Sequence, residues 1–584
     1  MKKLLLLFSV CALFAQGIDA KSITVDQARA IAMQQTTKSF KSSNANLSLG
    51  YSARNLKGQT DYYVFNRDGG QGFVIVAGDD LSTPVLAYST TGTFNMTTAP
   101  EPIKDMLKGY QDQMEWMRNH PQKLQGSTPS LRMNPEGVYP LFMNEYGEEV
   151  HWHQFEPYNQ YCPNTPQGRS YAGCAPIAFA QIMKGLQHPY RGAGEITYSY
   201  LLNGQEMTVT SNLANHTYKY RNMKNGYSAY TSGWQDVAQL VFDAGAGFHT
   251  RFSASSSDAS YKDIVKGMIA YFDYNPNVQF LLRQNYADQT WREMIYTELD
   301  EGRPVYYFGY RTVLNDGTQN AHVGHAFVVD GYDSEGKVHI LFGFQPEEYN
   351  AYFDFDLMSP RIYGDTPYEH DQVKEGFNAD QGAIIGIRPA LEDEPGGIVQ
   401  KAVNLVADTM PATDIRATID VQALSGPWSG TLRCGIVSKN TSSNGSVSYS
   451  TYYTFNKEVS VDENGIASID VSGSYPMLSN GQTYYFVIWS PYFPNNYDWN
   501  WFLDDPVPFT IGDWVTPPDP QFILGDVNND GKLSIGDVTA LINYLLSGDA
   551  TDINLDAADC DQDGEIKIGD VTELINMLLT TPAE

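Results

Sequence analysis

Cys174 occupies a position at which a thiol could be activated as a nucleophile. Pro176 suits a first helical turn, and apolar residues recur at helical spacing from Ile177 to Leu186. Cys174 is therefore predicted to lie at a helix N-terminus, where the macrodipole favours an anion and lowers the pKa of a thiol. Gly173 leaves room for a substrate to approach. Because a single Cys is more often a small buried hydrophobe, the neighbouring chemistry decides between these interpretations.

A nucleophilic thiolate needs a general base nearby, and histidine is the usual one. The chain has only 10 histidines, which narrows the search. Two of them, His322 and His325, lie in the segment AHVGHAFVVDGYD, where Gly324 to Val329 indicate a buried strand. A His at the head of such a strand can project into the edge of a cleft. The pair with Cys174 is weak evidence by itself, because packed Cys and hydrogen-bonded core His residues are commoner.

The acidic C-terminal tail carries a second candidate chemistry. Between Leu524 and Glu584 the chain holds ten Asp, three Glu and two Lys, a net charge of −11. The segment 535–546 (IGDVTALINYLL) recurs as 568–579 (IGDVTELINMLL), 33 residues later. Each copy follows a loop with the oxygen and glycine spacing that suits a hard cation. The predicted calcium ligands are Asp526, Asn528, Asp530, the Lys532 carbonyl and Asp537 in the first loop, and Asp559, Asp561, Asp563, the Glu565 carbonyl and Asp570 in the second.

Length and charge limit the classes of protein to which the chain can belong. Its 584 residues exceed what one hydrophobic core usually supports, so several domains are expected. Apolar residues make up 42% and aromatic residues 13%, which excludes a mainly disordered chain. The net charge of −30 disfavours nucleic acid and anionic membrane surfaces as partners, because phosphate binding needs clustered cations.

The N-terminus has the pattern of a signal peptide. Lys2 and Lys3 precede an apolar run from Leu4 to Phe14, and Ala20 is a plausible cleavage site. The run is too short to span a bilayer, so we expect a secreted or cell-surface protein without membrane insertion. Four cysteines would remain, too few for a disulfide scaffold and without zinc spacing: Cys162, Cys174, Cys434 and Cys560.

The expected domain boundaries lie in polar and Pro-rich segments. The mixture of predicted helices and strands indicates an α+β fold class. Segment 122–136 resembles an exposed linker, 391–397 (LEDEPGG) is an acidic boundary, and prolines at 517, 518 and 520 make a stiff spacer. The expected units are a signal peptide at 1–20, a small α+β domain at 21–128, a larger mixed domain at 129–390, an immunoglobulin-like β-sandwich at 391–515 and a small all-α calcium-binding module at 516–584.

The order of motifs in residues 22–390 resembles the streptopain family of papain-like cysteine peptidases. The segment GCAPIAFAQIMKGLQHPY is similar to its nucleophile helix, and residues 152–163 are similar to its W-x-Q-x-x-P-Y-N…C-P lead-in. Residues 324–331 match its histidine strand, and residues 376–389 match its closing strand. The N-terminal region, which contains residues 63–66 and 72–80, resembles the family's inhibitory prodomain. The separation of 151 residues between Cys174 and His325 is also similar to that in papain-like enzymes.

The resemblance implies a papain-like domain with a defined set of roles. Cys174 would be the nucleophile, His325 would take and return its proton, and Gln154 would donate to the oxyanion. His322 is the rival base, but His325 occupies the matching Gly-His-Ala position. Protein or peptide substrates and the chain's own prodomain, as inhibitor, are the implied partners, and catalysis would need no cofactor.

The C-terminal tail resembles a type I dockerin module. In that family paired helices dock onto a cohesin, which implies a cohesin-like partner and attachment to a complex or a cell surface. The alternative interpretation is a calcium-stabilised cap at the end of the chain. Both interpretations require calcium in the two loops.

One departure from the family separates two functional hypotheses. The family run H-x-N-W-G-W-G-G has an Asn that orients the imidazole, and here Leu341 stands in its place, with Phe342 and Phe344 replacing the tryptophans. The first hypothesis is a secreted cysteine endopeptidase made as a zymogen. The second is a catalytically impaired or inactive homologue that acts as a binding or scaffold protein. A disulfide between Cys162 and Cys174 would also silence the nucleophile, although the family-like context of Cys162 indicates a separate structural position.

Overall fold

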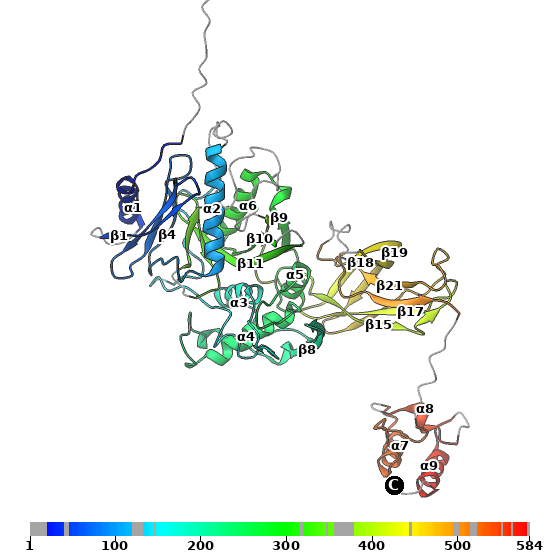
Figure 1. Ribbon diagram of the computed structural model, residues 1–584. Helices are drawn as coiled ribbons and strands as arrows, with labels where there is room; N and C mark the ends of the chain where they lie inside the picture. The colour runs from blue at the N-terminus through cyan, green and yellow to red at the C-terminus, as the bar shows by residue number, and fades with distance from the viewer. Residues whose placement is uncertain are drawn as a thin grey trace, which may run out of the picture.

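The computed structural model describes most of the chain. The described residues are 20–39, 46–119, 132–144, 146–315, 319–345, 349–354, 379–442, 447–493, 501–513, 523–550, 553–561 and 565–580. Within them, the side chains at 288, 311–315, 319–323 and 379–380 lie outside the description. Figure 1 shows the successive units of the chain, from the blue N-terminal elements to the red C-terminal helices.

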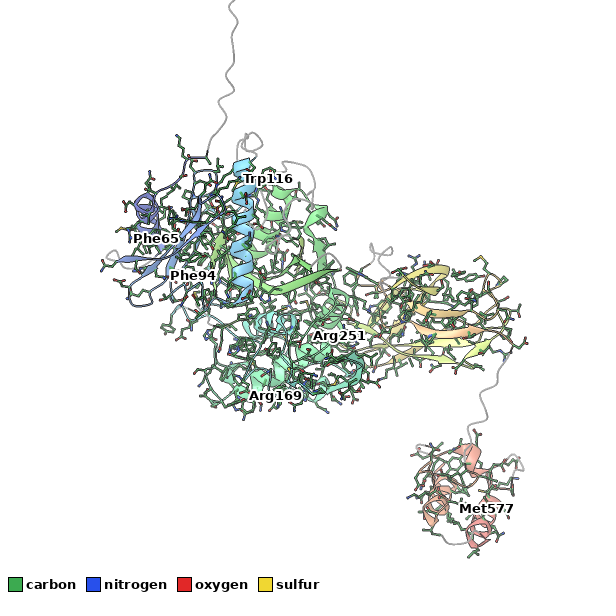
Figure 2. All side chains as sticks on the ribbon, viewed as in Figure 1. Phe65, Phe94, Trp116, Arg169, Arg251 and Met577 are labelled. Carbon is green, nitrogen blue, oxygen red and sulfur yellow. The ribbon has the colours of Figure 1, made fainter. Side chains whose placement is uncertain are left out.

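The N-terminal unit is an antiparallel sheet with a helix on each face. The Thr24 hydroxyl accepts the Gln27 amide at 3.3 Å and so caps the first helix. Phe65 and Phe94, labelled in Figure 2, belong to the two apolar clusters on either side of the sheet. Its elements are α1 (Val25–Ser39), β1 (Leu47–Arg54), β2 (Thr60–Arg67), β3 (Phe73–Ala77), β4 (Val85–Ser89) and α2 (Glu101–Asn119).

The next unit mixes helices with a second set of antiparallel strands. Its helices are α3 (Cys174–Leu186), α4 (Trp234–Gly247), α5 (Tyr261–Ala270) and α6 (Asp288–Asp300). Its strands are β5 (Asn164–Thr165), β6 (Gly168–Arg169), β7 (Glu195–Leu202), β8 (Gln205–Asn212), β9 (Gln279–Leu282), β10 (Val305–Asn315), β11 (Gln319–Tyr332), β12 (Lys337–Leu341), β13 (Ala351–Asp354) and β14 (Ala379–Ile385). The helix predicted after Gly173 and the strand predicted at 324–329 are both present.

The two units share one sheet and one hydrophobic core. Strand β4 pairs with β13, which gives the ten-stranded order β1-β2-β3-β4-β13-β12-β11-β10-β14-β9. At this junction the Tyr88 and Tyr352 rings stack with centroids 4.9 Å apart, and Tyr88 donates to Asp333 at 3.0 Å. Helices α2 and α6 contribute to a common apolar cluster with alternate residues of β10, β11 and β12. Removing the N-terminal unit would therefore expose both a strand edge and an apolar face.

Residues 398–511 form two sheets that enclose their own core. The three-stranded sheet has the order β15-β17-β20 and the five-stranded sheet β16-β22-β21-β18-β19, and apolar residues of both sheets belong to one cluster. We call this part of the chain the β15–β22 unit. Its strands are β15 (Ile398–Leu405), β16 (Thr409–Met410), β17 (Ala417–Ala423), β18 (Trp428–Thr441), β19 (Val447–Val461), β20 (Ile466–Asp470), β21 (Thr483–Ile488) and β22 (Val507–Ile511).

A buried ion pair joins the β15–β22 unit to α5. The Lys266 side chain is 1% exposed, and its Nζ lies 3.3 Å from a carboxylate oxygen of Asp504 and 3.7 Å from one of Asp263. Although burial opposes the charge, the nearby carboxylates raise the pKa of Lys266. The Ser425 hydroxyl donates to the Ile269 carbonyl at 3.0 Å across the same boundary.

The described part of the C-terminal tail contains three helices and the loops between them. Its helices are α7 (Ile535–Ser547), α8 (Leu555–Ala558) and α9 (Ile568–Thr580), and α7 and α9 share a small apolar core. The repeated segments 535–546 and 568–579 thus form equivalent helices. Among the helices in the described ranges, none combines the length and the apolar character needed to cross a membrane.

Breaking the ion pair at Lys266 should weaken the attachment of the β15–β22 unit. Replacement by alanine (Lys266→Ala) removes the buried cation from Asp263 and Asp504 and leaves only the partly exposed Lys262 near Asp263, so we expect a loss of roughly 3 kcal/mol in the free energy of unfolding. Chemical denaturation measures this loss. The matched control is Lys262→Ala on the same helix, because Lys262 is 22% exposed and lies 3.9 Å from Asp263. A loss in the Lys266 variant no larger than that in the control would contradict the prediction.

Candidate active site

Helix α3 places Cys174 at its first residue and packs against β11. Gly173 precedes the helix with φ 94°, a left-handed conformation that favours glycine. A side chain there would also meet Ser257 at 3.2 Å, so glycine permits the close approach of two segments. The Cys174 thiol lies close enough to the Ala326 backbone amide on β11 for that amide to favour the thiolate. The nucleophile predicted from the sequence is thus adjacent to the predicted histidine strand.

The pKa of the Cys174 thiol differs from the prediction based on the helix terminus alone. Burial raises this pKa above its usual value, although the backbone amides of Ala326, Ala175 and Cys174 favour the thiolate. The Asp258 carboxylate raises it further. The expectation that the helix N-terminus lowers the pKa was therefore wrong for this state of the chain, because desolvation outweighs the amide dipoles.

His325 lies inside β11, not at the head of a short strand. Its register partner on β10 is Gly309, and its side chain is 4% exposed. The ring lies 4.8 Å from that of Phe344 and is nearly parallel to that of Phe342 at 6.2 Å. This burial lowers the pKa of His325 to about 4, so the imidazole is neutral at neutral pH.

A backbone carbonyl orients the His325 ring. Nε2 of His325 lies 2.7 Å from the Phe342 carbonyl oxygen. Because a carbonyl can only accept, Nε2 must carry the proton and Nδ1 must carry the lone pair. The Phe342 amide in turn donates to the Asn350 side-chain oxygen at 2.9 Å, and Asn350 is 5% exposed. The acceptor expected to be missing because of Leu341 is therefore supplied by the neighbouring peptide group.

Leu341 and Phe342 belong to different apolar clusters. Leu341 is fully buried, pairs with Val328, and belongs to the apolar cluster of α3 and α4. Phe342 and the aromatic neighbours of His325 belong to the cluster of α2 and α6. Leucine at 341 is consistent with this apolar environment, in which an amide would lack a partner.

Gln154 and its neighbours form the lead-in to the nucleophile. Gln154 is buried, and its backbone carbonyl accepts a hydrogen bond from the Ala172 amide at 3.0 Å. This bond fixes the Gln154 backbone beside Ala172, which stands two positions before Cys174. The Trp152 amide donates to the Gln181 side chain of α3 at 3.3 Å. The structure thus brings Gln154, Cys174 and the His325 strand together. The side chain of the rival base His322 lies outside the described residues.

Cys162 does not block the nucleophile. All four cysteines of the described chain are free, and Cys162 is buried in the apolar core. Burial also raises its pKa to a value far above that of an ordinary thiol. Cys162 therefore has the separate structural position expected from its sequence context.

The acidic loops of the tail bring buried carboxylates together. In the first loop, Asp526 is 4% and Asp537 0% exposed. Asp526 accepts the amides of Asp530 and Gly531 at 3.0 and 2.9 Å. In the second loop, the oxygens of Asp559, Asp561 and Asp570 all lie within 4.8 Å of one another. Asp563 lies outside the described residues.

The chemistry of this donor set fits calcium. The second loop gathers three carboxylate oxygens, and Asp537 of the first loop and Asp570 of the second are fully buried. A cation would offset the cost of burying these charges. Asn528, the Lys532 carbonyl and the Glu565 carbonyl are the remaining predicted donors, at the loop positions that the spacing assigns.

Sequence reasoning missed several residues around the thiol. Asn350 and the Phe342 carbonyl were not predicted, because a carbonyl has no sequence signature and Asn350 stands eight positions further along. Asp258 was missed because it comes from a separate loop. Tyr306 was also missed. Its buried hydroxyl has no hydrogen-bond partner among the described residues. Burial mainly raises the pKa of Tyr306, and the nearby Cys174 raises it further.

Comparison with protein families gives three separate matches. Residues 152–353 match the peptidase C10 family, residues 20–114 match the Spi protease inhibitor, and residues 524–579 match the dockerin type I domain. The first two regions adjoin in the shared sheet, and the third coincides with the acidic tail.

Comparison with individual proteins gives cysteine peptidases. The thiol protease/hemagglutinin PrtT of Porphyromonas gingivalis is 28% identical over 385 residues, covering 64% of this chain but only 42% of that protein. Streptopain of Streptococcus pyogenes is 29% identical over 354 residues, covering 57% of this chain and 83% of that protein.

Two solved structures from Prevotella intermedia are also similar. A prointerpain A fragment is 25% identical with a TM-score of 0.47, covering 60% of this chain and all of that one. Active interpain A is 27% identical with a TM-score of 0.35, covering 43% of this chain and 95% of that one. Residues 152–353 are thus similar to the peptidase C10, or streptopain, family, with a region similar to the Spi protease inhibitor before them and one similar to the dockerin type I domain after them.

Proposed function

We propose that the chain is a secreted cysteine endopeptidase, made as a zymogen, in which Cys174 attacks the peptide carbonyl and His325 transfers the proton. One observation carries this proposal. The thiol at the start of α3 lies close to the β11 backbone next to His325, whose ring is held as the Nε2–H tautomer by the Phe342 carbonyl. That tautomer presents a basic Nδ1, which can accept the thiol proton and return it to the leaving amine.

Gln154 is proposed to stabilise the oxyanion together with the Cys174 backbone amide. Its buried position beside Ala172 supports this role, since a donor kept away from water is worth more to a developing charge. One such donor contributes about 2.7–4 kcal/mol to transition-state stabilisation in a related type of site.

The described state is proposed to be the latent zymogen. The raised pKa of Cys174 and the lowered pKa of His325 keep both groups neutral, and both shifts come mainly from burial. Part of that burial comes from the N-terminal unit, because Phe342 shares a core with α2. The Phe342 ring also meets that of Phe353, the register partner of Ala87 in β4. Release of the N-terminal unit would therefore loosen and hydrate the surroundings of His325.

The inactive scaffold is the less favoured alternative. Its motivation was Leu341, and the Phe342 carbonyl supplies the acceptor that Leu341 lacks. The relatives are also named as thiol or cysteine proteases.

Self-processing tests the nucleophile. We expect the purified wild-type chain to be cut between residues 120 and 140 under reducing conditions, and the Cys174→Ala chain to stay intact, as measured by mass spectrometry. Cys434→Ala is the matched control, because Cys434 is a buried free thiol in the β15–β22 unit. An intact wild-type chain that also escapes labelling by a thiol-directed peptidyl inhibitor would refute the proposed activity.

Removing the support of the Phe342 peptide should slow catalysis. In Asn350→Ala the Phe342 amide loses its acceptor, so the carbonyl that orients His325 is less well held. We expect kcat/KM for a peptide substrate to fall about tenfold, the effect of losing one buried hydrogen bond. Conservative Asn350→Asp, which keeps an acceptor oxygen, should recover part of the loss.

The family residue at 341 serves as the comparison for that experiment. We expect Leu341→Asn to leave kcat/KM no higher and to lower the free energy of unfolding by about 2–4 kcal/mol, because it buries an amide in an apolar core. Higher activity in Leu341→Asn would show that the side chain at 341, not the Phe342 carbonyl, governs the orientation of His325.

The tail is proposed to bind two calcium ions and to attach the enzyme to a cohesin-like partner or a cell surface. The donor sets of both loops support calcium, which would neutralise clustered carboxylates and hold α7 and α9 together. Secretion is supported by the signal-like pattern of residues 1–20. We also propose that 21–128 is the inhibitory prodomain, 129–390 the papain-like domain, 391–515 an immunoglobulin-like β-sandwich and 516–584 the all-α dockerin-like module.

Calcium titration tests both loops. We expect isothermal titration calorimetry to give two sites in the wild-type chain and one in each of Asp537→Ala and Asp570→Ala. A chelator should lower the unfolding temperature of the tail in the wild type. The control is Asp556→Asn, an acidic residue of α8 outside the predicted ligands. A wild-type chain that binds no calcium would refute the assignment.

A further inference from the structure

A band of aromatic side chains begins beside the candidate nucleophile. The Tyr261 ring, at the start of α5, stacks on that of Phe308 with centroids 4.1 Å apart. Phe308 is the register partner of Ala326, whose amide the Cys174 thiol reaches. Burial raises the pKa of Tyr261, and Tyr310 and then Cys174 add smaller contributions. Tyr261 is therefore near both the strand and the thiol of the site.

The band continues into the β15–β22 unit. The Phe280 ring lies 4.9 Å from that of Tyr261 and 5.1 Å from that of Trp501. The Phe493 ring lies 4.3 Å from that of Trp501 and 6.3 Å from that of Phe280, so it packs beside both. Two ring-to-ring contacts thus connect Tyr261 to Trp501 through Phe280. The combined length of these two contacts is similar to that of about three residues of an extended peptide.

Two polar contacts attach the β15–β22 unit to α5. Lys266 joins it to α5 through the buried ion pair with Asp504, and Ser425 bonds the Ile269 carbonyl. Figure 1 shows this unit beside α5 and on the opposite side of the molecule from α1 and β4. The band is therefore not the surface on which the prodomain sheet docks.

Four rings of the band are only partly buried, and they pack against the same apolar core as Cys174. These are Tyr261, Phe280, Tyr310 and Trp501. Aromatic rings that keep an exposed face next to a reactive group are typical of surfaces that bind apolar side chains.

We propose that this aromatic band binds the apolar and aromatic side chains of an extended polypeptide substrate, so that Trp501 and the β15–β22 unit take part in substrate selection. The proposal rests on the proposed peptidase function and assigns a role to a region outside the peptidase family match. Continuity with Cys174 favours a polypeptide as the occupant, because a chain held at the thiol must pass along one of the adjoining surfaces.

The test compares a long with a short substrate. The long peptide carries aromatic residues on both sides of the cleaved bond, and the short one ends next to that bond. We expect Trp501→Ala to lower the ratio of kcat/KM for the long peptide to that for the short one by about tenfold, mainly through KM. Trp501→Phe should restore most of the ratio. An unchanged ratio in Trp501→Ala would overturn the proposal.

The matched control is Tyr452→Ala, an exposed aromatic residue on β19 in the same unit, which should leave the ratio unchanged. A binding measurement separates this proposal from the proposed function. The labelled long peptide is titrated into the full chain after alkylation of Cys174, and Trp501→Ala should weaken binding about tenfold even if the chain shows no turnover. Equal binding by both chains, or binding of a neutral oligosaccharide in place of the peptide, would refute the proposal.

Discussion

The packing of the α3 N-terminus against β11 is the contact on which the rest of the site depends. It brings the Cys174 thiol close to a strand residue, Ala326, that stands 152 positions later in the sequence. Just before the helix, Gly173 has a positive φ and no side chain, which leaves room for Ser257 beside the start of α3. The strand is positioned by its long antiparallel register with β10. The helix positions the thiol, and the sheet positions the base.

Backbone groups perform tasks that side chains perform in the resembled family. The Phe342 carbonyl orients the imidazole, and Asn350 holds the peptide that bears this carbonyl. A backbone acceptor has a physical advantage, because its direction is fixed by the sheet and carries no side-chain entropy cost. It also leaves position 341 free for a fully buried leucine, which packs with α3. A substitution that looks inactivating in the sequence is thus accommodated by the local backbone.

The sequence correctly predicted the helices and strands that local residue patterns specify. The helix after Gly173, the strand around His325 and the repeated helices of the tail follow from periodicity and capping, which act over a few residues. The β4–β13 pairing could not be predicted, because Ala87 and Phe353 are distant in sequence and neither carries a signal for the other. The pKa of Cys174 was predicted in the wrong direction, because the helix dipole is visible in the sequence and desolvation is not.

Strand β11, which carries His325, lies inside the shared sheet, with the N-terminal unit at one end of that sheet and the β15–β22 unit packed on α5 beyond the other side. The N-terminal unit adds a strand edge and apolar surface, so its removal must leave β13 as an edge. That edge is short, Ala351–Asp354, and short edges resist pairing with other chains. The β15–β22 unit is attached instead by a buried ion pair and aromatic packing, with no strand pairing to the large sheet among the described residues. The two attachments therefore differ in kind. When the N-terminal unit leaves, the paired strand edge and the shared core become exposed. The buried ion pair between Lys266 of α5 and Asp504 instead favours a β15–β22 unit that remains attached. A surface proposed to select substrates must remain attached in this way.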